Sequence, residues 1–304
     1  MKIAIHGLGR MGSQIAQKLS ENNEINVIAH NRSKEPIDAV VKYGAIAAYT
    51  KEDLIKEFGN QRVVLWLMLP SEIVDDQLKE WLKILPKGSL IIDGGNSDFR
   101  KTQQRNQMLQ SQGHSFIDIG VSGGVWGYKN GFSMMCGSDK TEDYDSLKNI
   151  LITLASPNGD FDLYGPSGSG HFVKMVHNAI EYGIMESLAE GYRLIKEGPI
   201  KNIDLVKVSR VWQHGSVVTS WLNELTGLAL AENPNLEGIN GDVAQSGEAL
   251  WSLEVAKELQ IPMPAIDESF KVRIESQKGS TNFSTKLLSA MRNKFGGHKL
   301  NNED

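Results

Sequence analysis

The sequence predicts an α/β domain with a mostly parallel sheet, followed by an all-helical domain. Three observations support this prediction. Short apolar runs alternate with amphipathic stretches in the first half of the chain. Beyond Pro166 the strand patterns stop and long helical patterns take over. A glycine motif, Gly7 to Gly12, follows the first apolar run. We therefore expect a Rossmann-like, doubly wound domain over 1–165 and a helical domain over 166–304.

Short apolar runs bounded by turn residues predict the strands of the first domain. They span residues 2–6, 26–30, 63–69, 89–93, 115–119, 133–136 and 161–164. Amphipathic stretches between them predict helices at 13–19, 72–82 and 100–112. Strands that alternate with helices imply a parallel sheet covered by helices on both faces.

The second domain begins after a Gly- and Ser-rich junction at 165–170. Its helical patterns span 171–196, 204–213, 216–231, 247–258 and 264–277. Residues from Gly296 onward are expected to form a mobile tail.

Charge and cysteine content limit the classes of function. The formal net charge is −5, so nothing favours binding to nucleic acid. The overall negative charge would repel an anionic substrate, so a local cluster of cationic side chains would have to bind it. Cys136 is the single cysteine, which excludes an intramolecular disulfide and a cysteine-based metal cluster and fits a reducing compartment. We expect Cys136 to be a core residue and predict no metal site.

No targeting or membrane segment is visible in the sequence. His6 and Arg10 interrupt the apolar N-terminus before a signal sequence could form. The apolar run at 63–69 is far too short to span a bilayer. We therefore expect a cytoplasmic protein with no membrane partner.

The motif Gly7-Leu8-Gly9-Arg10-Met11-Gly12 matches G-x-G-x-x-G. The pattern alone is weak, but here it follows a predicted strand and opens a predicted helix, as a dinucleotide site requires. The first glycine permits the tight turn, the second lets the pyrophosphate approach the backbone, and the third lets the helix pack on the strand. The helix N-terminus then offers free N–H groups to the phosphates.

The end of the second strand favours NADP over NAD. An acidic residue there would accept the ribose 2′-hydroxyl of NAD, but this chain has Asn31-Arg32-Ser33. Arg32 offers a fork of donors to a 2′-phosphate and Ser33 adds a hydroxyl. Arg32 as a solvated surface residue is the plainer alternative, and NAD stays the alternative cofactor.

Two more strand ends are expected to line the cofactor. Asn96 follows the strand at 89–93, at the carboxyl edge of the sheet where ligands gather, and is expected to contact both the nicotinamide end and the substrate. Met68 and Leu69 are expected to line the cofactor in the same way. Plain turn chemistry is the competing interpretation of these segments.

The most informative segment is the helical pattern that starts at His171. At 100° per residue its polar side chains fall within an arc of roughly 140°. They are His171, Lys174, His177, Asn178, Glu181 and Tyr182. This stripe is either a solvated face or the lining of a site. Its mixed chemistry, and its place directly after the Gly-Ser-Gly junction, favour a ligand site.

Three segments carry a resemblance to a known family. Residues 168–183 closely resemble the signature helix of 6-phosphogluconate dehydrogenases. Gly120-Val-Ser-Gly-Gly124 is similar to the substrate-binding loop of that family. Arg292-Asn-Lys-Phe-Gly-Gly-His298 resembles the segment that a partner subunit contributes to the site. The resemblance covers nearly the whole chain and is to the short form, with one helical domain.

The resemblance implies oxidative decarboxylation of 6-phosphogluconate to ribulose 5-phosphate and CO2 with reduction of NADP, a reaction of the pentose phosphate pathway. It makes Lys174 the base that takes the proton of the C3 hydroxyl. It makes Glu181 the acid that protonates C1 of the enediol. It also implies a homodimer, or a dimer of dimers, in which the C-terminal tail enters the neighbouring site.

The resemblance further implies which residues bind the substrate. The carboxylate end would be held by Ser122, Gly123 and Gly124, the hydroxyls by Asn178 and His177, and the phosphate by Tyr182 and Arg273 with Arg292 and His298 of the second subunit. Arg273, Arg292 and Lys174 would then form the local cation cluster that the net charge demands.

Two departures from the family pattern keep other functions open. Leu250 stands where the family commonly has a phosphate-binding lysine, and Val125-Trp126 replaces acidic residues beside Gly124. A related β-hydroxyacid dehydrogenase for a small unphosphorylated acid is one alternative, and activity without the phosphate would favour it. A non-catalytic NADP-binding sensor is the other, and binding without turnover would favour it.

Overall fold

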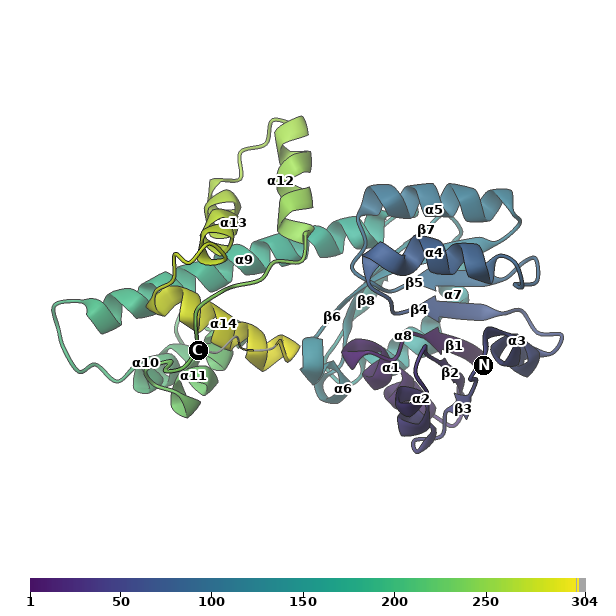
Figure 1. Cartoon of the computed structure of the whole chain (residues 1–304), viewed down its shortest axis with the longest axis horizontal. Coiled ribbons are helices and arrows are strands. Elements are labelled where there is room, and N and C mark those ends of the chain that lie inside the picture. The colour runs from purple at the N-terminus through teal and green to yellow at the C-terminus, as the bar shows by residue number, and fades with distance from the viewer. Residues whose placement is uncertain (299, 301–304) are drawn as a thin grey trace. The chain divides into compact units, whose positions relative to one another are not determined.

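The computed structural model describes residues 1–298 and 300 (Figure 1). The chain divides into two compact units, Met1–Lys174 and a second unit that begins at Met175. The division lies within α9 (Ser169–Glu197), a helix of 29 residues. The domain boundary that we expect after Gly165 stays a prediction.

The first unit is built on an eight-stranded sheet with the order β3-β2-β1-β4-β5-β6-β7-β8. The strands are β1 (Lys2–His6), β2 (Asn26–His30), β3 (Ile46–Ala47), β4 (Val64–Leu67), β5 (Leu90–Asp93), β6 (Ser115–Ser122), β7 (Ser133–Ser138) and β8 (Phe161–Leu163). All neighbours pair in parallel except β6 and β7. This confirms the predicted Rossmann-like, mostly parallel sheet.

Helices cover both faces of the sheet (Figure 1). Side chains alternate across each strand, so Ile3 and Ile5 face one layer while Ala4 faces the other. The first layer contains α1 (Arg10–Ser20), α2 (Lys34–Val41) and α8 (Lys148–Ala155), and the second contains α3 (Lys51–Phe58), α4 (Ser71–Trp81) and α5 (Phe99–Ser111). A turn of α6 (Gly127–Asn130) and α7 (Thr141–Ser146) complete the unit.

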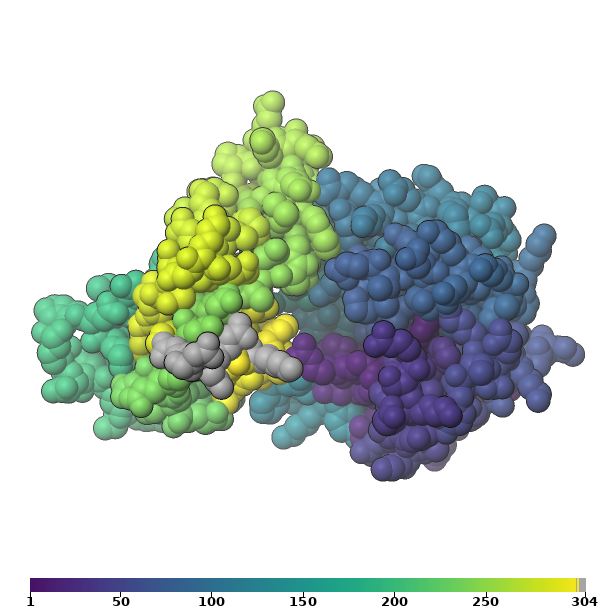
Figure 2. Space-filling view, in the orientation of Figure 1, coloured from purple at the N-terminus to yellow at the C-terminus, as the bar shows by residue number. Residues whose placement is uncertain are grey.

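The second unit is helical, as predicted. Besides the rest of α9 it contains α10 (Leu205–Gln213), α11 (Trp221–Glu232), α12 (Glu248–Glu258), α13 (Pro264–Ser276) and α14 (Phe283–Gly296). Its main core joins Met185 and Tyr192 of α9 to Leu230 of α11 and to Leu287 and Met291 of α14. In Figure 2 the yellow surface of α13 and α14 adjoins the green surface of α12 within this unit.

Several elements differ from the sequence prediction. The short strand β3 and the helices α2, α3, α7, α8 and α14 were not anticipated. The sixth strand is longer than expected, because it continues through Ser122 while paired with β7. The expected tail lies largely outside the described residues, which include His298 and Leu300.

Two smaller expectations can be compared with the structure. Cys136 is buried in β7, as expected, and burial raises the pKa of its thiol to about 12. Among the helices of the described residues, none is both long and apolar enough to cross a membrane.

Candidate active site

The glycine motif forms the turn between β1 and α1. Gly7 has a φ of +103°, and a Cβ there would lie 2.4 Å from the carbonyl oxygen of Met68. A Cβ on Gly12 would lie 1.9 Å from the carbonyl oxygen of Gly7, so the helix can pack here only without a side chain. A Cβ on Gly9 would meet no atom of the described residues within 4 Å, which leaves room for a ligand on this side of the turn. The three glycines therefore fit the roles that a dinucleotide site gives them.

Asn31 connects this turn to the end of β2. Its Oδ1 accepts a hydrogen bond from the backbone N–H of Leu8 at 3.1 Å, and its Nδ2 donates to the carbonyl of Ser33 at 3.3 Å. Arg32 and Ser33 follow on an exposed stretch before α2. Arg10 and Met11 open α1. No carboxylate occupies position 31, 32 or 33, where NAD would be recognised through its ribose hydroxyl.

The loops after β4 and β5 meet beside the glycine turn. The register pairs His6 with Leu67 and Leu67 with Asp93, so the residues that follow share one edge of the sheet. A Cβ on Gly95 would lie 2.5 Å from the carbonyl oxygen of Leu69, which shows that the two loops touch. Met68 and Asn96 lie on these loops, and Asn96 is exposed.

Two buried histidines lie beneath the glycine turn. His6 Nδ1 accepts a hydrogen bond from Trp81 Nε1 at 2.9 Å, and the His30 ring lies 4.9 Å from the His6 ring. Burial, reinforced by the charges of His30 and Lys51, lowers the pKa of His6 to about 3. Burial also lowers the pKa of His30. Both rings are therefore neutral at physiological pH, and the sequence prediction gave them no role.

A buried carboxylate anchors the start of α9 to the sheet. Asp118 of β6 accepts hydrogen bonds from the backbone N–H groups of Gly168 at 2.6 Å and His171 at 2.8 Å. Burial raises the pKa of Asp118, although both of these hydrogen bonds oppose the shift. The carboxylate satisfies N–H groups that have no partner inside the helix.

Lys174 lies one turn further along α9, packed against β6. A Cβ on Gly120 would lie 2.3 Å from the Cβ of Lys174, so only glycine at this position allows such close packing. Lys174 is only 7% exposed. Two residues after Gly120, β6 ends at Ser122, and Gly123 follows with a φ of +128°. The fold therefore brings Lys174 to the strand that leads into the predicted loop Ser122-Gly123-Gly124.

The second unit holds the other polar residues of α9. Asn178 Nδ2 donates to Glu248 Oε1 at 2.8 Å, and His177 Nδ1 lies 3.0 Å from Asn178 Oδ1. The hydroxyl of Tyr182 accepts a hydrogen bond from the backbone N–H of Ser246 at 3.3 Å. These contacts hold the side chains of α9 against the start of α12.

Arg273 of α13 completes this cluster. Its guanidinium lies 3.3 Å from the centre of the Tyr182 ring. Burial and the charge of Arg292 lower the pKa of Arg273 to about 10, while Tyr182, Glu181 and Glu186 act in the opposite direction. The structure thus brings Arg273 together with Tyr182 and places Arg292, on α14 of the same chain, within electrostatic reach. The ring of His298 lies 6.2 Å from that of Phe295.

Glu186 lies one turn beyond Tyr182 on α9. The residue is only 7% exposed, and its Oε2 has no hydrogen-bond partner among the described residues. Burial and the charges of Glu190 and Glu268 raise the pKa of Glu186 to about 7, against the opposing charge of Arg273.

The polar stripe of α9 is partly buried, since His171, Lys174 and Tyr182 are buried and the other three residues are half-buried, while part of the apolar side is exposed. His171 is 2% exposed and its Nδ1 lies 2.8 Å from Thr102 Oγ1. Ile180 and Ile184, in contrast, are 49% and 44% exposed. This distribution differs from that of a fully solvated polar face. A helix whose polar side points inward is typical of a functional lining.

The two departures from the family pattern are both visible. Leu250 is exposed on α12, where a lysine would reach solvent. Val125 and Trp126 lie in a 3-10 turn, Gly124–Trp126, and the carbonyl of Val125 accepts a hydrogen bond from Gln14 Nε2 at 3.1 Å. Trp126 is half-buried within this turn.

Sequence reasoning missed Asp118, Glu248, Arg105 and the two histidines, which support the predicted residues. Asp118 carried a signal, because it is an acidic residue in the middle of an otherwise apolar strand pattern. No sequence pattern indicated Glu248, because it lies 70 residues from its partner Asn178.

Two family models match the chain. Residues 2–165 match the NAD binding domain of 6-phosphogluconate dehydrogenase, and residues 170–282 match the C-terminal domain of 6-phosphogluconate dehydrogenase. Together these matches cover well over half of the sequence.

Full-length relatives carry the same name. A provisionally named 6-phosphogluconate dehydrogenase of Bacillus subtilis, YqeC, is 37% identical over 298 residues, which make up 98% of each chain. The NAD(+)-dependent, decarboxylating 6-phosphogluconate dehydrogenase of Haloferax volcanii is 33% identical over 306 residues and is matched over 100% of each chain.

Two solved structures have a similar fold. The 6-phosphogluconate dehydrogenase of Plasmodium falciparum, described with NADP+ and with 6-phosphogluconate, has a TM-score of 0.80 at 27% identity and covers 96% of this chain and 70% of its own. The 3-hydroxyisobutyrate dehydrogenase of Mycobacterium tuberculosis has a TM-score of 0.72 at 18% identity, covering 94% of this chain and 97% of its own, which shows a shared fold.

Proposed function

Because the chain belongs to the 6-phosphogluconate dehydrogenase family, we propose that it converts 6-phosphogluconate to ribulose 5-phosphate and CO2 with reduction of NADP. The observation that carries the proposal is the polar stripe of α9, in which Lys174 is buried and Glu181 is half-buried. Seven residues separate the two, so helix geometry turns both side chains to the same side of α9.

Lys174 and Glu181 divide the proton transfers between them. A dinucleotide held at the glycine turn would supply the hydride acceptor needed to oxidise C3 of the substrate. Lys174, acting as a neutral amine, takes the proton of the C3 hydroxyl, which leaves a β-keto acid. The ammonium of Lys174 then donates a hydrogen bond to the ketone oxygen, which accepts the electrons of the C1–C2 bond as CO2 leaves. Glu181 delivers a proton to C1 of the enediol.

The family pattern assigns the rest of the substrate to other residues. Ser122, Gly123 and Gly124 hold the carboxylate end, and His177 and Asn178 hold the hydroxyls. The phosphate goes to Tyr182 and Arg273. This assignment is supported by the contact of the Arg273 guanidinium with the Tyr182 ring, because stacking keeps the fork of donors in a fixed plane.

The remaining phosphate ligands and the subunit arrangement follow the family pattern. We assign Arg292 and His298 to the phosphate of a neighbouring subunit's substrate in a cytoplasmic homodimer or dimer of dimers. The apolar side chains exposed on the second unit support an association of chains. They include Ile180, Ile184, Leu194, Ile200 and Val218.

NADP is the proposed cofactor, held by residues of the first unit. These residues are Gly7, Leu8, Gly9, Arg10, Met11, Gly12, Asn31, Arg32, Ser33, Met68, Leu69 and Asn96. The open side of Gly9 supports a dinucleotide, and the absence of a carboxylate at positions 31–33 supports a 2′-phosphate on it. NAD is the alternative, and the Haloferax volcanii relative is named as NAD(+)-dependent.

Leu250 favours a second candidate function. Its apolar, exposed side chain offers no phosphate contact. A β-hydroxyacid dehydrogenase acting on a small unphosphorylated acid would use the same Lys174 and Ser122 without needing one.

A turnover assay tests the proposal. The chain is incubated with 6-phosphogluconate, gluconate or 3-hydroxyisobutyrate, each with NADP or NAD, and reduced cofactor is recorded. We expect turnover with 6-phosphogluconate and NADP, and faster than with either unphosphorylated acid. Faster turnover of an unphosphorylated acid would favour the second candidate, and binding without any turnover would indicate a sensor.

A variant pair locates the base. Lys174→Met should abolish turnover while cofactor affinity stays within about twofold, because the lost group acts on the substrate. Lys56→Met, at an exposed lysine of α3, should behave like the wild type. Near-native turnover of Lys174→Met would overturn the assignment.

A further inference from the structure

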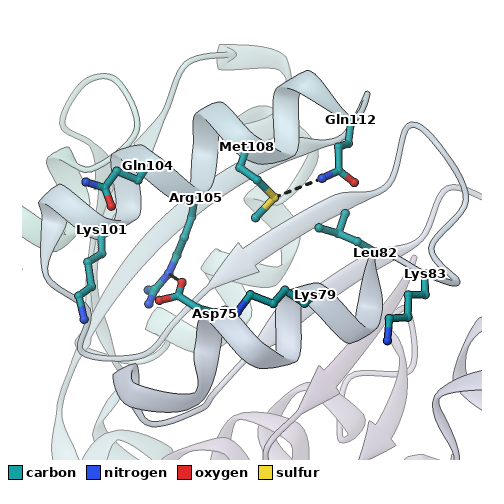
Figure 3. A pocket seen from close by; sticks show the side chains of 9 residues that line it. All are labelled: Asp75, Lys79, Leu82, Lys83, Lys101, Gln104, Arg105, Met108 and Gln112. Atoms are coloured by element: carbon teal, nitrogen blue, oxygen red, sulfur yellow. Dashed lines mark hydrogen bonds and ion pairs between the residues drawn. The ribbon is translucent and has the colours of Figure 1, made fainter.

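A groove of about 560 Å³ lies between α4 and α5 in the first unit (Figure 3). Figure 3 shows Arg105 of α5 reaching across it to Asp75 of α4, with Lys79, Lys83 and Lys101 around it. The three lysines are exposed, whereas Arg105 is only 2% exposed. An arginine this deeply buried needs partners for its donors, and their identity indicates its role.

The guanidinium of Arg105 bonds in two directions. Towards α4, Nε donates to Asp75 Oδ1 at 2.6 Å and Nη2 donates to the carbonyl of Ser71 at 3.3 Å. Towards the sheet, Nη1 donates to Asp93 Oδ2 at 3.0 Å and to Ser97 Oγ at 2.8 Å. Consistent with this, the hydrogen bond from Arg105 is the main cause that lowers the pKa of Asp75.

The inner contacts organise the loop after β5. Asp93 Oδ1 accepts from the backbone N–H of Gly95 at 3.1 Å, and Oδ2 accepts from Ser97 Oγ at 2.9 Å. The loop thus folds around one buried carboxylate, and Arg105 supplies the opposite charge that this carboxylate requires. Asn96 lies between the two residues that bond Asp93.

The outer contacts organise the loop after β4. Ser71 and Asp75 belong to the first turns of α4, which starts directly after Met68, Leu69 and Pro70. The two loops also touch each other at Gly95 and Leu69. One planar, rigid side chain therefore ties together both loops that we assign to the cofactor, and a flexible ammonium would not reproduce its several bonds in fixed directions.

We propose that Arg105 is a positioning residue, which fixes the loops carrying Met68, Leu69 and Asn96 relative to each other so that the nicotinamide is held against the substrate. The inference rests on the proposed function for its effect on turnover. Its effect on cofactor binding can be read without any substrate. Sub-ångström displacement of such loops lowers the rate because productive geometry is lost.

The test compares Arg105→Lys with the wild type. Lysine keeps the positive charge beside Asp93 but lacks the planar guanidinium that donates hydrogen bonds to both loops. We measure kcat, KM, thermal midpoint, and affinity for two ligands by calorimetry. One ligand is the preferred dinucleotide, and the other is its fragment without nicotinamide, ADP-ribose or 2′-phospho-ADP-ribose. Lys101→Met is the matched control, because Lys101 lies one turn earlier on the same helix and lines the same groove.

We expect Arg105→Lys to lower kcat by about 10-fold or more with KM for the substrate changed by less than about threefold. Affinity for the dinucleotide should fall about fivefold or more, while affinity for the fragment should stay within about twofold. Ser97→Ala, which removes a smaller part of the network, should show the same pattern more weakly. Lys101→Met should match the wild type in every measurement.

Two results would overturn the proposal. One is a kcat for Arg105→Lys within twofold of the wild type with unchanged dinucleotide affinity. The other is an equal loss of affinity for dinucleotide and fragment together with a lowered thermal midpoint, which a merely structural role would produce. If the wild type itself fails to turn over 6-phosphogluconate, the proposed function fails, and the ratio of the two affinities alone decides the role of Arg105.

Discussion

His6 and Glu186 are buried ionisable side chains whose pKa values are shifted in opposite directions. The pKa of His6 falls to about 3, so the folded protein disfavours its cationic form. The pKa of Glu186 rises to about 7, so the folded protein disfavours its anionic form. Each shift links folding stability to pH, over a window set by the ordinary and the shifted value.

His6→Gln should weaken the acid sensitivity of the fold. Between pH 6.5 and 3 the unfolded His6 binds a proton that the folded protein does not, so stability falls as pH decreases. The slope from this one group is at most about 1.4 kcal/mol per pH unit. Urea unfolding at pH 4 to 7 should show a shallower decline in the variant. An exposed histidine, changed in His214→Gln, is the control, and equal slopes for wild type and His6→Gln would refute the expectation.

Glu186→Gln should have the opposite pH signature. Between pH 4.5 and 7 the folded protein holds a proton on Glu186 that the unfolded chain releases, so wild-type stability falls as pH rises. The variant lacks this loss, and its stability relative to the wild type should increase by about 1–3 kcal/mol from pH 4.5 to 8. Chemical unfolding across that range measures it, with Glu224→Gln at an exposed position of α11 as control. A pH-independent difference would show that Glu186 ionises normally in the fold.

At the scale of elements, the N-terminal turn of α9 is fixed by the sheet rather than by a side chain of its own. Asp118 bonds two of its N–H groups, and glycines at 120, 137 and 170 allow the helix to lie directly on β6 and β7. A Cβ on Gly170 would lie 2.4 Å from the carbonyl oxygen of Met135. The position of Lys174 therefore follows from the sequence of two strands.

Asp118→Asn should loosen this anchor. The amide keeps the size of the carboxylate but loses the charge-assisted bonds to Gly168 and His171, which should cost about 1–3 kcal/mol of unfolding free energy. Turnover should fall more than cofactor affinity, because Lys174 moves while the glycine turn stays in place. Urea unfolding and steady-state rates measure the two effects, and unchanged turnover in the folded variant would contradict the anchoring role.

The segment between β2 and α2 should decide the cofactor. Arg32→Glu replaces the proposed 2′-phosphate donor with a repelling charge, so kcat/KM for NADP should fall by about 10-fold or more while that for NAD stays within about threefold. Lys42→Met, later on the same surface, should leave both values unchanged. An equal effect on both cofactors would mean that Arg32 does not contact the 2′-phosphate.

Sequence patterns predicted the elements that carry strong periodicity. The strands at 2–6 and 26–30 match β1 and β2 residue for residue, because each is an apolar run that ends at a motif. β3 was not predicted, because two residues are too few to show an alternation of apolar and polar side chains. Its position is set by its pairing with β2. α14 was not predicted either. Most of its residues are buried, so its sequence lacks the continuous polar face of a surface helix.

The residues of the candidate site also differ in how far the sequence reveals them. The residues that we assign to ligand contacts lie in short local motifs that a sequence displays, as with Gly7, Gly9 and Gly12. The residues that hold them in place could not be predicted, because their partners are far along the chain: Asp118 lies 50 residues from Gly168, and Trp81 lies 75 from His6. The direction in which the α9 stripe faces also depended on packing, which the helical wheel does not contain.

At the scale of the whole molecule, exposed apolar side chains distinguish the second unit. Ile180 and Ile184 project from α9 without cover in the chain that the structure describes. In light scattering the wild type should have at least twice the mass of one chain. Ile184→Asp should lower that mass towards one chain and reduce turnover, since Arg292 and His298 are assigned to a neighbouring site. A wild type that is monomeric and active at assay concentration would remove the shared-site assignment.

Label release tests most directly the claim that α9 carries the base of an oxidative decarboxylation. 6-Phosphogluconate labelled with 13C at its carboxylate is mixed with the wild type and NADP, and 13CO2 and reduced cofactor are followed together by NMR. The account predicts one labelled CO2 for each cofactor reduced, in the wild type, and neither product from Lys174→Met. Cofactor reduction with the label retained in the sugar acid would contradict it.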